Sequence, residues 1–253
     1  MANQIDGTNR WGPMGGRWDG VRWGQDRWIR NLFEPKGAAE SFEQCLFEAC
    51  GAFGWRLHAF VIMRNHFHLA VETPEPNLSA GMKWLQGTWA MRFNRFRGET
   101  GRPFQGRYKA LHVEPGHALA QVAHYLHLNP VRARVVGAAR LAEFSWSSLW
   151  WFAQRGRSAC LILETVLAES GGLADTKPGW QSYLAYLDLL AVEDTKRCEE
   201  KFRRLSRGWA VGTEDFKAGL KKTTHARRRL HGATRTPRRR PRSPPPNSRG
   251  DVG

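Results

Sequence analysis

The stretch LHAFVIMRNHFHLAVETPEPNL, residues 57–78, decides the fold that we expect for this chain. Its beginning is rich in apolar and branched side chains, which is typical of a β-strand. Residues 66–72, HFHLAVE, are a second such run, and only residues 63–65 separate the two. Strands this close in sequence favour an antiparallel hairpin with a tight turn.

Helical patterns flank the hairpin on both sides. Before it, apolar residues recur at three- and four-residue steps from Ser41, and Gly54 stands where a helix is expected to end. After it, Asn77 is expected to cap a long helix, since its side-chain oxygen can accept hydrogen bonds from amide groups of the first turn. That helix carries an apolar stripe of Leu78, Met82, Leu85, Trp89, Phe93 and Phe96.

A third strand and a further helix follow. Residues 106–114, GRYKALHVE, predict the strand, and Gly116 opens the helix. The core face of this helix is Leu119, Val122 and Leu126. We expect Pro130 to end it, because the residue before a proline disfavours helical geometry. Since helices alternate with antiparallel strands, the fold class is α+β, with helices packed on one face of an open antiparallel sheet.

The charge of the chain indicates a polyanionic partner, nucleic acid before membrane. The 253 residues carry a formal net charge of +16, of which the nine arginines and one aspartate after Lys222 contribute +8. The four cysteines form no CxxC pair, which argues against a structural zinc site. No apolar run approaches the roughly 20 residues that span a bilayer, and no secretory signal opens the chain. We therefore expect a cytoplasmic protein.

These patterns divide the chain into four parts. Residues 1–28 form an irregular segment, in which tryptophans and glycines follow neither a strand nor a helix period. A domain of alternating strands and helices over residues 29–137 follows, and then a helical appendage over residues 138–222. Residues 223–253 are a basic Pro/Arg tail that lacks core-forming side chains and is expected to be disordered.

Two histidines of the hairpin could bind a metal. His66 and His68 are two residues apart on a strand, so both side chains leave the same face. Imidazole nitrogens placed in this way can bind one divalent ion, although most such pairs are surface or core histidines. Glu72 lies on the same face, either as a partner of His68 or as a plain surface carboxylate.

A tyrosine and an asparagine form a second candidate pair. Tyr125 and Asn129 are one helical turn apart and therefore share a face. An amide oxygen suits Mg²⁺ or Mn²⁺, and a phenol near a cation can become a nucleophile. A half-buried structural tyrosine and a helix-ending asparagine are the alternative interpretation.

The motifs around these residues resemble a known family. The stretch at 57–78 is similar to the histidine–hydrophobic–histidine strand of the HUH endonucleases. FQGRYKAL (104–111) and HYLHLNPVRA (124–133) are similar to later motifs of the single-tyrosine transposases, in particular the REP-associated tyrosine transposases. The similarity runs from about Asn31 to Val136.

This resemblance implies a ferredoxin-like sheet and a metal-dependent endonuclease that nicks and rejoins single-stranded or hairpin DNA through a phosphotyrosine. It makes Tyr125 the nucleophile, and it makes His66, His68 and Asn129 the ligands of Mg²⁺ or Mn²⁺. We expect a monomer or homodimer without membrane contact. The basic residues expected to contact DNA are Arg64, Arg92, Arg95, Arg107, Lys109, Arg132 and Arg134.

The chain departs from the family at its start. The family opens with a strand of the tyrosine–histidine–valine type, and residues 21–33, VRWGQDRWIRNLF, keep only its end. We therefore expect that residues before about Trp28 do not form the central strand and that the enzyme is weak. Two alternatives stay open, namely a DNA-binding relative without catalysis and a metal-dependent hydrolase without a covalent step.

Overall fold

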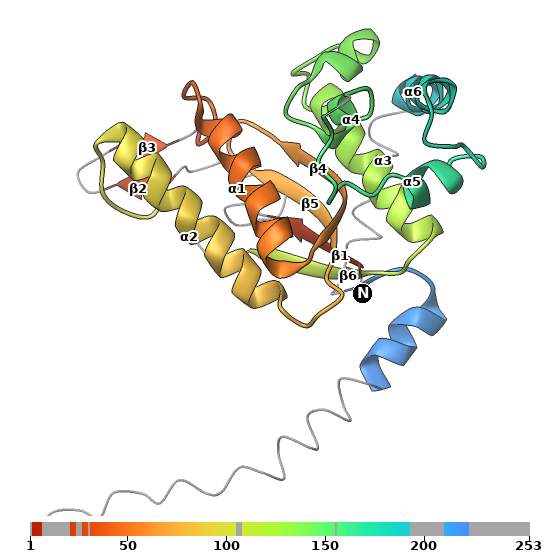
Figure 1. Ribbon diagram of the computed structural model, residues 1–253, viewed down its shortest axis with the longest axis horizontal. Coiled ribbons are helices and arrows are strands. Elements are labelled where there is room, and N and C mark those ends of the chain that lie inside the picture. Colours follow the sequence, from red (N-terminus) through yellow and green to blue (C-terminus); the bar gives the residue numbers. More distant parts are fainter. Residues whose placement is uncertain are drawn as a thin grey trace, which may run out of the picture. The chain divides into compact units, whose positions relative to one another are not determined.

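The predicted hairpin lies at one side of a five-stranded sheet in the computed structural model of the protein (Figure 1). Its strands β4 (Arg56–Ile62) and β5 (Phe67–Glu72) pair antiparallel, which confirms the hairpin. The structure describes residues 2–6, 21–23, 27–29, 31–104, 108–154, 156–192 and 210–222.

The middle strand of the sheet is β1 (Ala2–Asp6), at the very start of the chain. It pairs antiparallel with β5 on one side and with β6 (Lys109–Val113) on the other. The expectation that residues before Trp28 stay out of the central sheet is therefore wrong. ANQID has no apolar alternation, but a strand between two neighbours is held by backbone hydrogen bonds, which do not depend on side-chain type.

Two further pairings complete the strands. The short β7 (Ala210–Val211) runs parallel to β6, so the sheet order is β4-β5-β1-β6-β7. A separate antiparallel pair is formed by β2 (Val21–Trp23) and β3 (Arg27–Ile29). The segment that we expected to be irregular thus contains three strands, and the otherwise antiparallel sheet has one parallel pair at its edge.

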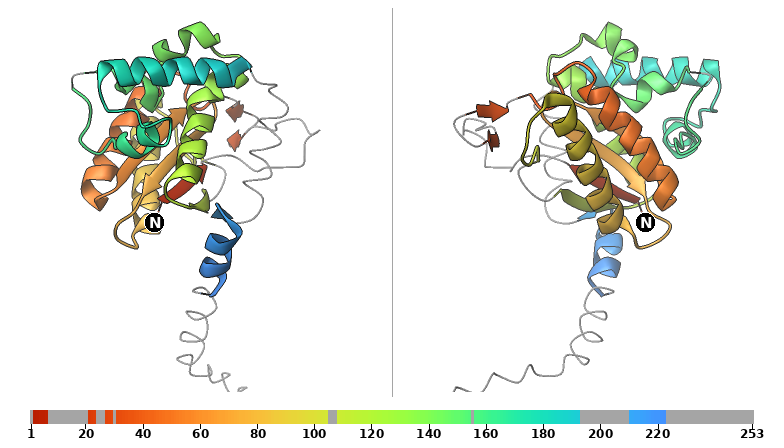
Figure 2. Two further views of the ribbon diagram at one scale, coloured as in Figure 1. Left: turned by 90° about the vertical axis from the view of Figure 1, so that its right-hand side faces the viewer. Right: turned by 60° about the vertical axis from the view of Figure 1, so that its left-hand side comes forward.

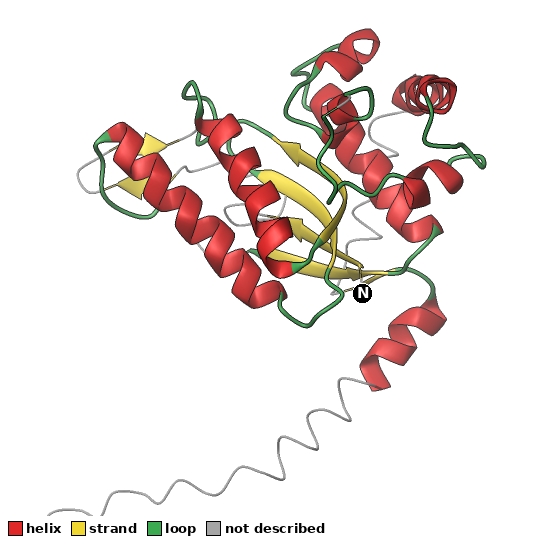
Figure 3. Ribbon diagram, viewed as in Figure 1, coloured by secondary structure: helices red, strands yellow, loops and turns green. Residues whose placement is uncertain are grey.

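Helices cover both faces of the sheet rather than one (Figures 1 and 2). α1 (Ala38–Phe53) and α2 (Leu78–Arg97) pack on one face, and α3 (His117–Arg132) packs on the other. The α+β class is confirmed (Figure 3), but the expected one-sided packing is wrong. Both hairpin strands are buried on both faces, so their alternate side chains enter two separate cores.

The end of α1 and the start of α2 show how the sequence positions these two helices on the sheet. α1 ends as predicted at Gly54, which adopts a left-handed φ of 64°. The Asn77 side chain makes no capping hydrogen bond to α2. Its oxygen accepts instead from the indole N–H of Trp55 at 2.8 Å, and its amide group donates to the Phe53 carbonyl at 2.8 Å. Asn77 therefore links the start of α2 to the end of α1 and to the residue before β4.

Two other details of the helices differ from expectation. Phe96 is 72% exposed, so the apolar stripe of α2 ends at Phe93. α3 continues through Pro130 to Arg132. Pro130 has no N–H to donate within the helix. The turn after it is nevertheless closed, because the Ala133 N–H donates to the Asn129 carbonyl at 2.9 Å. The predicted core face of α3 is buried as expected.

Residues 138–192 cover the free edge of β4. Isolated bridges join Val61 to Ser147 and Leu57 to Leu161, and the Ile62 N–H donates to the Trp146 carbonyl. An edge strand covered in this way is protected against pairing with other chains. The helical elements of this segment are η1 (Ala138–Glu143), α4 (Ser148–Trp151), α5 (Glu164–Ala168) and α6 (Lys177–Val192).

The chain divides into two compact units, Met1–Thr213 and Glu214–Gly253. Residues 214–222 of the second unit are helical, as predicted. The tail over residues 223–253 lies outside the described residues. Within the part of the chain that the structure describes, no helix is both long enough and apolar enough to cross a membrane.

Candidate active site

The candidate site is built on β5, along which successive side chains point to opposite faces of the sheet. Phe67, Leu69 and Val71 belong to the core under α1 and α2, whereas Ala70 belongs to the core under α3. His66 and His68 have the parity of Ala70 and therefore lie on the α3 face. Their ring centroids are 4.9 Å apart and their planes meet at 79°. The predicted convergence of these two histidines is thus present.

The two histidine rings lie in different surroundings. Nδ1–H of His66 donates to Oδ1 of Asn65 at 2.7 Å. His68 is 4% exposed, and desolvation lowers its pKa to about 4. A neutral imidazole is the form that binds a metal ion, so the His68 ring is suited to be a ligand at neutral pH.

α3 brings Tyr125, the first residue of the second predicted pair, next to His68. The ring of the half-buried Tyr125 lies 6.3 Å from the ring of His68, centroid to centroid. Asn129, one turn further along α3, is 9% exposed and so lies within the protein rather than in solvent. The guanidinium carbon of Arg132 lies 5.0 Å from the centre of the Tyr125 ring. Two segments about sixty residues apart in sequence therefore meet at one site.

The donor set of a metal at this place would be mixed. No group of three or more His, Cys, Asp or Glu side chains among the described residues could hold an ion. Two imidazole nitrogens and one amide oxygen would form an incomplete coordination sphere and would leave positions for oxygens of a substrate or water. The chemistry of His66, His68 and Asn129 fits a divalent ion of the Mg²⁺ or Mn²⁺ type.

Comparison with known proteins adds an independent finding. The family model described as "Transposase IS200 like" matches residues 29–129, a stretch that contains both histidines, Tyr125 and Asn129. The predicted family resemblance is thereby confirmed. The solved structure of a REP-associated tyrosine transposase bound to a REP hairpin is also similar, with a TM-score of 0.43 and 12% identity over 65% of this chain and 85% of that chain. No curated protein matches the sequence significantly.

The basic residues near the IS200-like motifs lie in different surroundings. Arg64 is ion-paired with Glu34 at 3.0 Å, and both terminal nitrogens of Arg92 donate to Glu48. This carboxylate raises the pKa of the Arg92 guanidinium. Arg95 is exposed on α2, Arg134 is exposed just after α3, and Arg107 lies outside the described residues.

Lys109 is the basic residue that the sheet register brings to the histidine face. Asp6 of β1 lies opposite His68 of β5 and opposite Lys109 of β6. Residues that lie opposite each other in adjacent strands share a face of the sheet. Lys109 is exposed and shares the parity of Leu111 and Val113, which belong to the core under α3. The IS200-like region thus presents Lys109 and Arg132 on the side of Tyr125.

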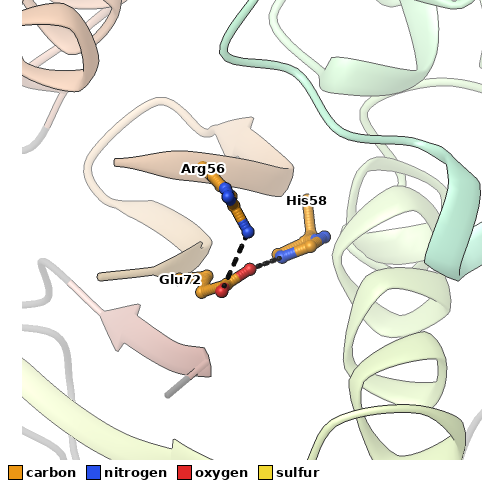
Figure 4. A network of polar contacts seen from close by, with 3 residues as sticks. All are labelled: Arg56, His58 and Glu72. Atoms are coloured by element: carbon orange, nitrogen blue, oxygen red, sulfur yellow. Dashed lines mark hydrogen bonds and ion pairs between the residues drawn. The ribbon is translucent and has the colours of Figure 1, made fainter. Parts of the chain in front are cut away.

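Glu72 has partners other than the histidine pair. Its carboxylate contacts Arg56 and His58 of β4, at 3.4 Å in each case (Figure 4). The register of β4 against β5 shifts between Leu57 and Ala59, which places His58 in a bulge. Glu72 therefore belongs to a local network between the two strands.

Two contacts of the site were not predicted from the sequence. Asn65 orients the ring of His66, and Arg132 stacks on Tyr125. The second has a signal in the sequence, because Tyr125, Asn129 and Arg132 follow the i, i+4, i+7 spacing of a helix face. The first has none, since a hydrogen bond between adjacent strand-end residues depends on the local turn.

Proposed function

We propose that this protein is a transposase-like DNA endonuclease and strand transferase that nicks and rejoins single-stranded or hairpin DNA through a phosphotyrosine at Tyr125. The observation that carries this proposal is the meeting of α3 and β5, where the Tyr125 ring lies 6.3 Å from the ring of His68. The match of residues 29–129 to IS200-like transposases supports the same chemistry.

The proposed step exchanges one phosphoester bond for another. The Tyr125 hydroxyl releases its proton to solvent, and its oxygen forms a bond to a DNA phosphorus. The bond between that phosphorus and the leaving DNA oxygen breaks, and the leaving oxygen keeps the electron pair and takes a proton from water. Because the phosphoester is retained, a free DNA hydroxyl can reverse the step and reseal the strand.

His66, His68 and Asn129 are the residues that would hold a divalent ion. When bound, Mg²⁺ or Mn²⁺ supplies a Lewis acid that withdraws charge from the phosphodiester. The protein prepares the site by keeping His68 neutral through burial and by fixing the His66 ring through Asn65. These contacts orient the ligands before DNA arrives.

The contribution of the basic residues to DNA binding is proposed to be unequal. Lys109 and Arg132 share the side of Tyr125 and are the strongest candidates for phosphate contacts close to the reaction. Arg95 and Arg134 are exposed and add general affinity. Arg64 and Arg92 are held by carboxylates, so we expect them to add least. The same role for Arg107 stays a prediction from the sequence.

The position of β1 favours an active enzyme over a weakened one. We expected a weak enzyme because a missing central strand would loosen the strand that carries the histidines. β1 instead pairs with β5 along its whole length, from Ala2 opposite Glu72 to Asp6 opposite His68. The structural reason for a loss of activity is therefore absent from this part of the sheet.

The proposal is tested by searching for a covalent protein–DNA adduct. A pool of internally labelled single-stranded oligonucleotides with random sequence, and a second pool that forms hairpins, are incubated with the protein and Mn²⁺ and resolved on a denaturing gel. We expect an adduct that needs the metal and that Tyr125→Phe abolishes, since this change removes only the phenolic oxygen. Tyr108→Phe is the matched control, because Tyr108 lies outside the site with its hydroxyl 3.1 Å from that of Ser79.

Each other result would contradict the proposal in its own way. Free cleavage products without an adduct would indicate a hydrolase, and binding without cleavage would indicate a DNA-binding relative. An adduct that persists in Tyr125→Phe but not in Tyr108→Phe would move the nucleophile to Tyr108.

A further inference from the structure

We propose that Arg132 is a catalytic residue of this reaction, which donates hydrogen bonds to the phosphoryl oxygens while Tyr125 forms its bond to phosphorus. The inference rests on the proposed function and deepens it. It goes beyond general DNA binding, because it gives Arg132 a role at the reacting phosphate itself.

The position of Arg132 follows from the geometry of α3. Tyr125, Asn129 and Arg132 are spaced by four and three residues, so their side chains leave one face of the helix. The Arg132 guanidinium lies against the Tyr125 ring, 5.0 Å from its centre. This contact holds a delocalised, permanently charged group next to the phenol that is proposed to react.

The hydrogen-bonding state of Arg132 is the second observation. Its Nη1 atom is shielded from solvent and has no hydrogen-bond partner among the described residues. A buried donor left without a partner costs roughly 1–3 kcal/mol, and more when it belongs to a charged group. Such a donor therefore calls for a ligand or a functional explanation.

A second arginine of the same protein shows what a structural stacking arginine looks like. Arg157 lies over the ring of Trp180 at 5.8 Å, but both of its terminal nitrogens also donate to Asp175, at 3.0 and 2.6 Å. No ion pair to a carboxylate of the described residues is found for Arg132. The stacking is similar and the anion is missing, so the site of Arg132 can accept an anion from outside.

A phosphodiester supplies the anion that fits this site. Guanidinium groups match phosphate oxygens with two parallel hydrogen bonds, and such bonds are strong where water is excluded. Negative charge on the non-bridging oxygens has to be stabilised while one phosphoester bond forms and the other breaks. Donors fixed at that place before the reaction lower the barrier without reorganisation, which is why we assign Arg132 to the step itself.

The experiment compares three variants in the adduct assay with the random single-stranded pool and Mn²⁺. Arg132→Ala removes the donors, Arg132→Lys keeps a charge without the planar group, and Arg140→Ala is the matched control. Arg140 carries the same charge but is exposed and paired with Glu143 at 2.7 Å. The rate of adduct formation at saturating DNA, the affinity for DNA and thermal unfolding are measured for each protein.

We expect Arg132→Ala to lower the rate at saturating DNA by roughly 100-fold, which is typical for the loss of one transition-state donor. Its affinity for DNA should change by only a few fold, and Arg132→Lys should recover part of the rate. Added methylguanidinium should restore part of the activity of Arg132→Ala, which a purely structural role would not allow. A rate within about threefold of the wild type, or a loss that neither lysine nor methylguanidinium relieves, would overturn the proposal.

A binding measurement without metal separates this inference from the proposed function. In EDTA, the dependence of affinity for the same DNA pool on salt concentration counts phosphate contacts, with a slope of about 0.7 per contact for single strands. Arg132→Ala should reduce the slope by about this amount and Arg140→Ala should not. If the wild-type protein forms no adduct but this difference is found, the proposed function fails while phosphate binding by Arg132 stands. If the slope is unchanged, Arg132 does not touch a phosphate and the inference fails.

Discussion

The two faces of the central sheet are built from different kinds of side chain. Under α1 and α2 the core is aromatic. The ring centroid of Phe42 lies 4.5 Å from that of Phe67 and 5.7 Å from that of Trp89, and the Phe33 ring lies 5.0 Å from both Phe42 and Trp89. Such rings bury large apolar areas. This layer contributes mainly to the stability of the fold.

Under α3 the buried side chains include several polar ones that depend on each other. Burial lowers the pKa of His127 to about 3, so its ring is neutral and lies between the hydroxyls of Tyr183 and Ser148, at 2.9 and 2.8 Å. Ser148 also accepts from the Phe60 N–H at 3.0 Å and donates to the Phe60 carbonyl. The network therefore joins α3 and α6 to the edge of β4.

The difference indicates a division of labour between the faces. Hydrogen bonds fix orientation more sharply than apolar contacts do, and α3 carries the residues whose orientation would matter for chemistry. β5 contributes alternate side chains to both layers. Alanine substitution of a residue of β5 that faces α3 should therefore lower activity, whereas alanine substitution of its neighbour that faces α1 and α2 should lower stability.

The largest effects are expected for two adjacent residues of β5. His68→Ala should remove metal-dependent adduct formation to below detection while leaving the fold and most DNA affinity intact, because the affinity comes mainly from phosphate neutralisation. Phe67→Ala should cost about 3–5 kcal/mol of stability, since the fully buried ring packs between Phe42 and Phe104, yet folded molecules should keep their activity.

This pair is checked by denaturant unfolding and by the adduct assay on the same samples. His66→Ala should behave like His68→Ala if both rings bind the ion. Full adduct formation by either histidine variant would remove the metal assignment. A Phe67→Ala protein that is stable but inactive would contradict the division between the faces.

A smaller effect on stability is expected at the network. Ser148→Ala leaves the Phe60 N–H and the His127 ring without their partner, at roughly 1–3 kcal/mol for each unsatisfied group. The neighbouring Ser147→Ala removes a capping hydrogen bond to the Leu149 N–H and should cost about 1 kcal/mol. Unfolding curves of the two variants give the comparison. Equal losses would mean that the network adds nothing beyond ordinary packing.

The smallest effect is expected from removing the basic tail after Lys222, whose charge belongs to neither face of the sheet. Truncation after Lys222 removes nine arginines and one aspartate, half of the net charge of +16. The tail should act as a general electrostatic arm, so its loss should weaken DNA binding and flatten the salt dependence but leave cleavage at low salt. Affinity measured at several salt concentrations tests this. An unchanged slope would show that the tail is an inert extension.

Much of the region around the hairpin could be predicted from local patterns. The strands at 56–62 and 67–72, the end of α1 at Gly54 and the buried face of α3 follow from periodicity and from glycine's tolerance of a left-handed φ. The same patterns pair His66 with His68 and Tyr125 with Asn129. Each of these predictions concerns residues within one element, where spacing alone determines which side chains share a face.

The errors concern contacts between elements. β1 could not be recognised because ANQID gains its place from backbone pairing with β5 and β6, strands that come more than sixty residues later. Asn77 has an amide group that could cap α2, but it bonds to Trp55 and Phe53 because these lie beside it in the folded chain. One-sided packing was expected, although a nearly continuous apolar run such as that of residues 57–63 is typical of a strand covered on both faces.

By itself, the sequence determined the helix and strand periods, the two candidate pairs and the charge of this protein, since these depend on residues close together along the chain. The tertiary structure decided that α3 lies across β5 and that Tyr125 faces His68. It also decided that Arg132 contacts Tyr125 with a buried donor whose partner is not among the described residues. The physical reason is that distance in space and exclusion of water arise only when separate elements pack, and no local spacing contains either quantity.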